Sequence, residues 1–159
     1  MSLTAQTAAH FRQVHFGGNW TDVDMKGTLA GVTWQQATTS VHGLNTIAAL
    51  VFHIHYYVGL LLKVLQGGPL DGHDKFSFDL PPIRSQEDWD QLLNQTWTDA
   101  EALAALIEQL PEAQLWEVFS QEKYGNYYRN ILGVTEHTHY HLGQIAVIKK
   151  MLSQAASPH

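Results

Sequence analysis

Apolar residues recur at intervals of three and four positions in four long stretches of the chain, a spacing typical of one buried face of an α-helix. The stretches predict helices over residues 2–16, 41–66, 85–110 and 126–153. The second stretch is apolar over much of its girth, so we expect that helix to lie deep in the fold. Four such helices with no clear pair of strands predict an all-α fold, an up-down four-helix bundle.

The first two predicted helices are joined by a long connection, residues 17–40, which is rich in glycine and threonine. It contains a short helical piece at 34–37, and Thr33 is placed to cap that piece. A connection of this length inside a compact domain either carries function or merely crosses one end of the bundle. The sequence leaves both interpretations open.

The connection between the second and third helices, residues 67–84, contains several prolines and is expected to be irregular. A short extended piece is predicted around residues 76–78. The third helix should begin after Ser85, which forms a weak capping box with Asp88 three residues later. The length of 159 residues favours one domain, and no internal repeat is present, so residues 1–159 are expected to form a single domain.

Composition limits the class of protein. Of 159 residues, 45% are hydrophobic and 15% are charged, which indicates a globular chain. The formal charge of −6 argues against a nucleic-acid-binding surface and a cationic membrane-binding face. The longest apolar stretch is interrupted by His53, His55 and Lys63, so we expect no membrane span. Since the N-terminus carries no basic, apolar leader, the expected location is the cytoplasm.

The chemistry of the chain is concentrated in its ten histidines, because it contains no cysteine. His137 and His141 have the spacing i, i+4 on the apolar face of the last helix, where two imidazoles can converge on one metal ion. His139 should point to the opposite side of that helix. The competing interpretation is a pair of core histidines that hydrogen-bond to tyrosines or backbone.

A third ligand would have to come from another helix. His53 and His55 of the second helix are about 200° apart around its axis, so one of them can face a common centre, and periodicity does not choose between them. The remaining candidates lie near helix ends or in loops, where a solvated side chain is expected: His10, His15, His42 and His73.

The segment His137-Thr138-His139-Tyr140-His141-Leu142-Gly143-Gln144-Ile145 resembles the HxxxHxGQ signature of DinB-like proteins, also called the DinB/YfiT group. Residues 50–57 are similar to the segment that carries the first ligand of that family. The resemblance implies a four-helix bundle with a divalent metal, commonly nickel or zinc, held by His53, His137 and His141. Ligand chemistry also suits iron or copper.

Three protein ligands leave at least one coordination position open, as in catalytic metal sites. We therefore expect a metal-dependent enzyme acting on a small molecule, either a transferase of a thiol or related nucleophile or a hydrolase. The resemblance implies a family in which some members act on thiol adducts. Because this chain has no cysteine, a low-molecular-weight thiol would have to be supplied as a cosubstrate. The alternatives are a non-enzymatic, stress-associated metal-binding dimer and a metal-free bundle with structural histidines.

Three residues are candidates for the substrate pocket: Tyr57, four residues after His53, and Asn19 and Trp20 in the long loop. For each of them, packing or loop structure is the competing role. Arg129 is a candidate for binding an anionic substrate, or a plain surface charge. Glu136 lies about 100° from its neighbour His137 around the helix, so we expect it not to be a metal ligand. The chain's many aromatic residues also suggest a homodimer.

Overall fold

The computed structural model describes residues 1–155, and that part of the chain is helical without any strand. An isolated bridge joins Val118 and Asn126. The long helices are α1 (Leu3–Phe16), α4 (Ile47–Leu65), α5 (Gln86–Gln109) and α6 (Tyr127–Ala155). The short ones are α2 (Met25–Leu29) and α3 (Trp34–Thr38), with 3-10 turns η1 (Asp74–Phe76), η2 (Glu112–Trp116) and η3 (Glu122–Tyr124).

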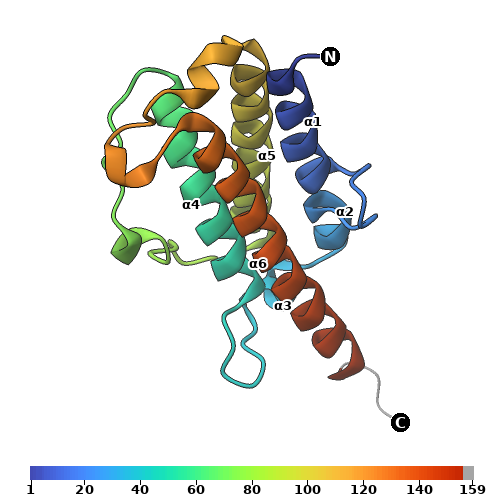
Figure 1. Cartoon of the computed structure of the whole chain (residues 1–159). Helices are drawn as coiled ribbons and strands as arrows, with labels where there is room; N and C mark the ends of the chain where they lie inside the picture. The colour runs from blue at the N-terminus through green and yellow to red at the C-terminus, as the bar shows by residue number, and fades with distance from the viewer. Residues whose placement is uncertain (156–159) are drawn as a thin grey trace.

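The four long helices pack around one hydrophobic core (Figure 1). α5 lies against α1 and α4, and α6 lies against the same two helices from the other side. The core is built from the apolar faces that the helical spacing predicted, with fully buried side chains such as Phe11, Ile54, Trp89 and Ile145. Each long helix therefore buries one face against two neighbours.

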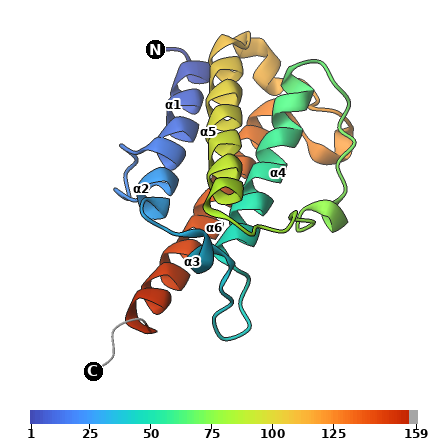
Figure 2. The same cartoon turned by 180° about the vertical axis from the view of Figure 1, so that it is seen from behind.

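α4 and α5 run in the same direction, so the long helices do not simply alternate (Figures 1 and 2). Phe52 of α4 shares a pocket with Leu92 of α5, and three residues further along α4, His55 bonds to Asp99. The predicted up-down order is wrong at this pair. The cause is the connection of residues 66–85, which returns along the side of the molecule. Twenty extended residues can cover about 60 Å, whereas α4 is only about 28 Å long.

Local hydrogen bonds decide where the helices begin. The hydroxyl of Thr46 accepts from the backbone N–H of Ala49, so α4 starts at Ile47 and not at residue 41 as the apolar pattern predicted. The hydroxyl of Ser85 accepts from the backbone N–H of Asp88, as expected for the start of α5. Thr33 caps α3 as predicted, in a full capping box with Gln36.

The two long connections differ from their predicted form. Residues 17–40 contain a second short helix, α2, in addition to the predicted piece at α3. The predicted extended piece at residues 76–78 is absent from the described structure, because the chain there makes the turn η1 and Ser77 closes it by bonding to Asp74.

α4 is long and apolar enough to cross a membrane, with 19 residues and a mean hydropathy of 1.7. Half of this apolar window is buried inside the protein. The buried face packs on α5 and α6, and the core helix of a globular protein can pass the same test of length and composition.

Candidate metal centre

Three histidine side chains from two helices meet between α4 and α6. Nε2 of His137 lies 3.0 Å from Nε2 of His53 and 3.1 Å from Nε2 of His141. The ligand atoms of all three residues lie within 4.8 Å of one another. A tetrahedral metal about 2.0–2.1 Å from each nitrogen would hold them about 3.3 Å apart. The three histidines could therefore hold one metal ion, and we call them the histidine triad.

The triad is not satisfied by hydrogen bonds among its own members. Each ring nitrogen has one position in the plane of the ring, which holds either a proton or a lone pair. Nε2 of His137 nevertheless lies within hydrogen-bond distance of two other nitrogens, one of His53 and one of His141. It can bond to only one of them at a time. A cation between the rings would take a lone pair from each nitrogen, so the residues present fit a metal.

Neighbouring groups hold two of the rings in place. Nδ1 of His141 lies 2.7 Å from Oε1 of Gln144, an oxygen that can only accept, so Nδ1 carries the proton and Nε2 presents its lone pair to the triad. Phe78 stacks on the ring of His53 at 4.1 Å between centroids. Nδ1 of His53 is buried and has no hydrogen-bond partner in the described part of the chain. The segment after η1 thus covers the α4 side of the triad.

Burial and the neighbouring rings favour the neutral form of His137 and His53. Burial, then the neighbouring His141 and His53, lowers the pKa of His137 to about 4. Burial and His141 also lower the pKa of His53, against a smaller raising effect of the Ser77 backbone. Because imidazole binds metals through the lone pair of its neutral form, a lowered pKa keeps these side chains competent as ligands below neutral pH.

A cleft of about 370 Å³ reaches the triad along the groove between α4 and α6. His137 lines one end of it beside Tyr57, whose ring centroid lies 4.8 Å from that of His137. The Tyr57 hydroxyl donates to Asp74 at 2.8 Å. Burial, followed by this bond to Asp74, raises the pKa of Tyr57, so the hydroxyl stays protonated at neutral pH. Of the three predicted pocket residues, Tyr57 thus lies beside the triad.

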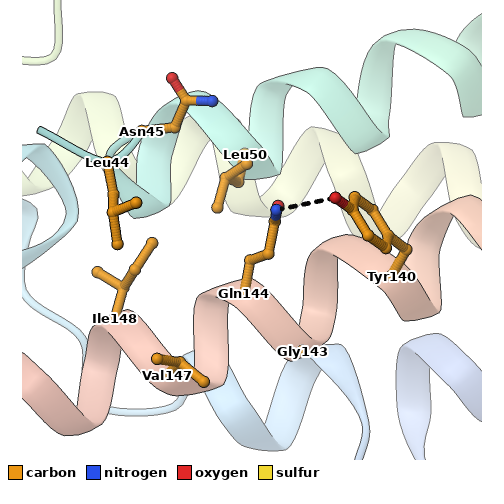
Figure 3. Close-up of a pocket in the computed structure, with 8 residues that line it drawn as sticks. All are labelled: Leu44, Asn45, Leu50, Tyr140, Gly143, Gln144, Val147 and Ile148. Atoms are coloured by element: carbon orange, nitrogen blue, oxygen red, sulfur yellow. Dashed lines mark hydrogen bonds between the residues drawn. The ribbon is translucent and has the colours of Figure 1, made fainter.

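A second pocket, of about 380 Å³, lies between the start of α4 and the middle of α6 and is mainly apolar (Figure 3). Its polar members are Asn45, Tyr140 and Gln144, and Nε2 of Gln144 lies 3.4 Å from the Tyr140 hydroxyl. The same Gln144 bonds to His141 through its oxygen. This amide therefore separates the apolar pocket from the triad.

Two histidines beside the triad residues in the sequence point elsewhere. Nε2 of His55 lies 2.7 Å from a carboxylate oxygen of Asp99 on α5, which leaves His53 as the member of α4 that faces α6. The ring of His139 lies 6.1 Å from that of His10 on α1. Glu136 is exposed and does not belong to the triad. Histidines two positions apart on α4, and likewise on α6, therefore point to different sides of their helix.

His15 departs from the sequence prediction. It was expected to be solvated at the end of α1, yet its side chain is fully buried. Its Nδ1 lies 3.0 Å from the Phe11 carbonyl, and its ring packs on Phe11 at 4.5 Å between centroids. Burial, opposed by the bond to Phe11, lowers the pKa of His15 to about 4, and the nearby His139 adds to the lowering. The cause is the tertiary packing of α1 against α5 and α6.

Asn19 and Trp20 do not line the cleft, which corrects their prediction as pocket residues. The Asn19 amide donates to the carbonyls of Gln13 and Val23, so it holds the α1–α2 loop together. Trp20 is 99% exposed. The loop lies beside α1 and α2, whereas the cleft lies between α4 and α6 (Figure 1).

Sequence reasoning missed the part played by Gln144 and Phe78. Gln144 is three residues after His141, a spacing that places both on one side of a helix, so the signal was present in the sequence. Phe78 carried no such signal, since it comes from an irregular segment whose path depends on tertiary packing.

Comparison with known proteins found no match of the chain to a family model, a curated protein or a solved structure.

Proposed function

We propose that this chain is a DinB-like, metal-dependent enzyme of the cytoplasm that acts on a small molecule, with His53, His137 and His141 as its metal ligands. The observation that carries the proposal is the position of the His137 Nε2 atom within 3.1 Å of two other ring nitrogens, an arrangement that a shared cation satisfies. Nickel or zinc is the expected metal, and iron or copper also suits three imidazoles.

Access to the triad favours an enzyme over a closed, non-enzymatic metal site. The described group contains three histidines and no fourth side chain, and His137 lines an open cleft. A divalent metal bound there would supply Lewis acidity that makes water or a thiol a better nucleophile at neutral pH. The protein would contribute neutral ligands, the Gln144 bond that orients His141, and the Tyr57 hydroxyl beside the cleft. The proposed reaction is transfer of a thiol or related nucleophile, or hydrolysis.

Metal analysis tests the first part of the proposal. Protein purified without a histidine tag and reconstituted with zinc or nickel should hold about one equivalent per chain. His53→Ala should bring the metal content to background, whereas His55→Ala, on the same helix but paired with Asp99, should not. Less than about a tenth of an equivalent in the wild-type protein, unchanged by reconstitution, would contradict the proposal.

The ligand-field spectrum of the cobalt-substituted protein tests the second part. Addition of 2-mercaptoethanol should change the spectrum if a coordination position is open to solvent. A cobalt spectrum that no small thiol or anion alters would favour the closed site of a non-enzymatic metal-binding protein.

A further inference from the structure

The cleft that reaches His137 is lined by a negative and a positive side chain at different positions along α6. Its lining includes Glu136 next to the triad and Arg129 at the far end, with Gly133 between them. Arg129 and His137 are eight residues apart, which corresponds to about 12 Å along the helix. The negative side chain thus lies close to the triad, and the positive one lies two turns away.

Arg129 is held in place but keeps donors to spare. Its Nη1 donates to the Tyr124 carbonyl at 2.9 Å, and its stem lies over Gly125, where an added Cβ would come within 3.0 Å of the Arg129 Cδ. No ion pair joins it to a carboxylate in the described part of the chain. A guanidinium has five N–H donors in a fixed plane, so most of them remain available to a ligand.

Gly133 leaves the floor of the cleft bare. A Cβ built on this helical residue would meet nothing within 4 Å, so open space lies above it. A ligand that lies along the helix from His137 to Arg129 could therefore pass close to the backbone at Gly133. The volume of about 370 Å³ is within the range of small-molecule pockets.

We propose that the cleft selects an elongated small molecule whose anionic end is bound by Arg129 while its metal-binding end reaches the triad. Glu136 supports this orientation, because its carboxylate repels an anionic end that lies near the triad, whereas Arg129 attracts it at the far end. The spacing requires about 10 Å or more between the two ends of the ligand. The inference rests on the proposed metal site and adds the class of substrate.

Matched thiol pairs test the inference in the cobalt-substituted protein, with thiol binding followed by the absorption spectrum. The long pair is 8-mercaptooctanoate and 8-mercapto-1-octanol, whose chains span about 10 Å. The short pair is 3-mercaptopropionate and 3-mercapto-1-propanol. We expect the long acid to bind at least about tenfold more tightly than the long alcohol, because its carboxylate gains a charged hydrogen bond. The short acid should have no such advantage.

Two pairs of variants locate the effect. Arg129→Gln should remove the preference for the long acid without changing cobalt binding, and Arg129→Lys should retain part of it. Gly133→Leu should weaken both long thiols by filling the floor of the cleft. Gly59→Leu is the matched control, because Gly59 is also helical, its added Cβ also meets nothing within 4 Å, and it does not line the cleft.

The outcomes separate this inference from the proposed function. Equal binding of the long acid and the long alcohol, or a preference for the acid that survives Arg129→Gln, would overturn the inference and leave the metal site standing. Failure of the wild-type protein to bind cobalt would overturn the proposed function and this inference with it.

Discussion

Two groups of histidines lie on opposite sides of α6 and differ in what their ring nitrogens meet. In the triad, Nε2 of His137 is within 3.1 Å of two further ring nitrogens. On the α1 side, Nε2 of His15 and Nε2 of His139 are both buried without a hydrogen-bond partner, and neither belongs to a convergent group in the described residues. Imidazole side chains are buried on both sides of α6, but among the described residues their nitrogens converge on one point in the triad alone.

The comparison shows that burial of a histidine is a weaker sign of a metal site than the convergence of its nitrogens. Burial lowers the pKa of His15 and of His137 alike to about 4. His15 gains a backbone partner through Nδ1 and ring packing on Phe11, which are structural contacts. His137 gains two further imidazoles. The pKa shift therefore reports desolvation on both sides, whereas geometry distinguishes the sites.

The largest expected effect separates the two sides of α6 directly. His141→Ala should lower zinc affinity at least about 100-fold, because it removes a ligand, whereas His139→Ala should change it by less than about threefold. Isothermal titration of metal-free protein with zinc measures both. Equal losses of zinc affinity in the two variants would show that histidines on both sides of α6 contribute to zinc binding.

A smaller effect is expected from the group that orients a ligand. Gln144→Leu removes the acceptor for the Nδ1 proton of His141 and should weaken zinc binding about 10–100-fold. Gln144→Glu retains an acceptor and should bind more tightly than Gln144→Leu in the same titration. Tyr140→Phe removes only the long contact to the other end of the amide and is the matched control. If Gln144→Leu binds like the wild type, the tautomer of His141 is not held by this bond.

The third expected effect concerns stability on the α1 side of α6. The folded-state pKa of His15, about 4, is below the usual value of 6.5, so on acidification the unfolded chain takes up a proton before the folded one does. The associated stability is present above about pH 6.5 and is lost as the pH falls toward 4. Between pH 7 and pH 5 the wild type should lose about 2 kcal/mol more than His15→Leu.

Urea unfolding with a metal chelator at both pH values measures this difference, because the triad then contributes equally to the wild type and the variant. His10→Ala, which removes an exposed histidine of the same helix, should keep the pH dependence of the wild type. Identical pH dependence in the wild type and His15→Leu would mean that His15 can be protonated in the folded protein.

Much of the helical structure could be predicted because its causes are local. The apolar spacing identified all four long helices, and the side chains of Ser85 and Thr33 marked helix starts through bonds to residues three positions away. Local spacing misplaced the start of α4, because residues 41–46 continue the apolar pattern while Thr46 caps the helix after them. The parallel course of α4 and α5 depends on the path of residues 66–85, which no periodicity describes.

The histidine triad was predictable in part. The i, i+4 spacing of His137 and His141 identified two of its members. The choice of His53 over His55 came from a family resemblance, and the structure adds its physical reason, since Asp99 of α5 pairs with His55 on the other side of α4. Asn19 and Trp20 do not line the cleft as predicted, because the sequence of a loop does not indicate which face of the protein the loop covers.

The sequence by itself determined the helices, most of their ends and the pair of imidazoles one turn apart, because backbone hydrogen bonds and helical periodicity act within a few residues. Only the tertiary structure decided that a third imidazole, 84 residues from His137, joins that pair and that an open cleft lined by Glu136 and Arg129 leads to it. Contacts of this kind depend on how whole helices rotate and pack, and that is settled by burial of every apolar face at once.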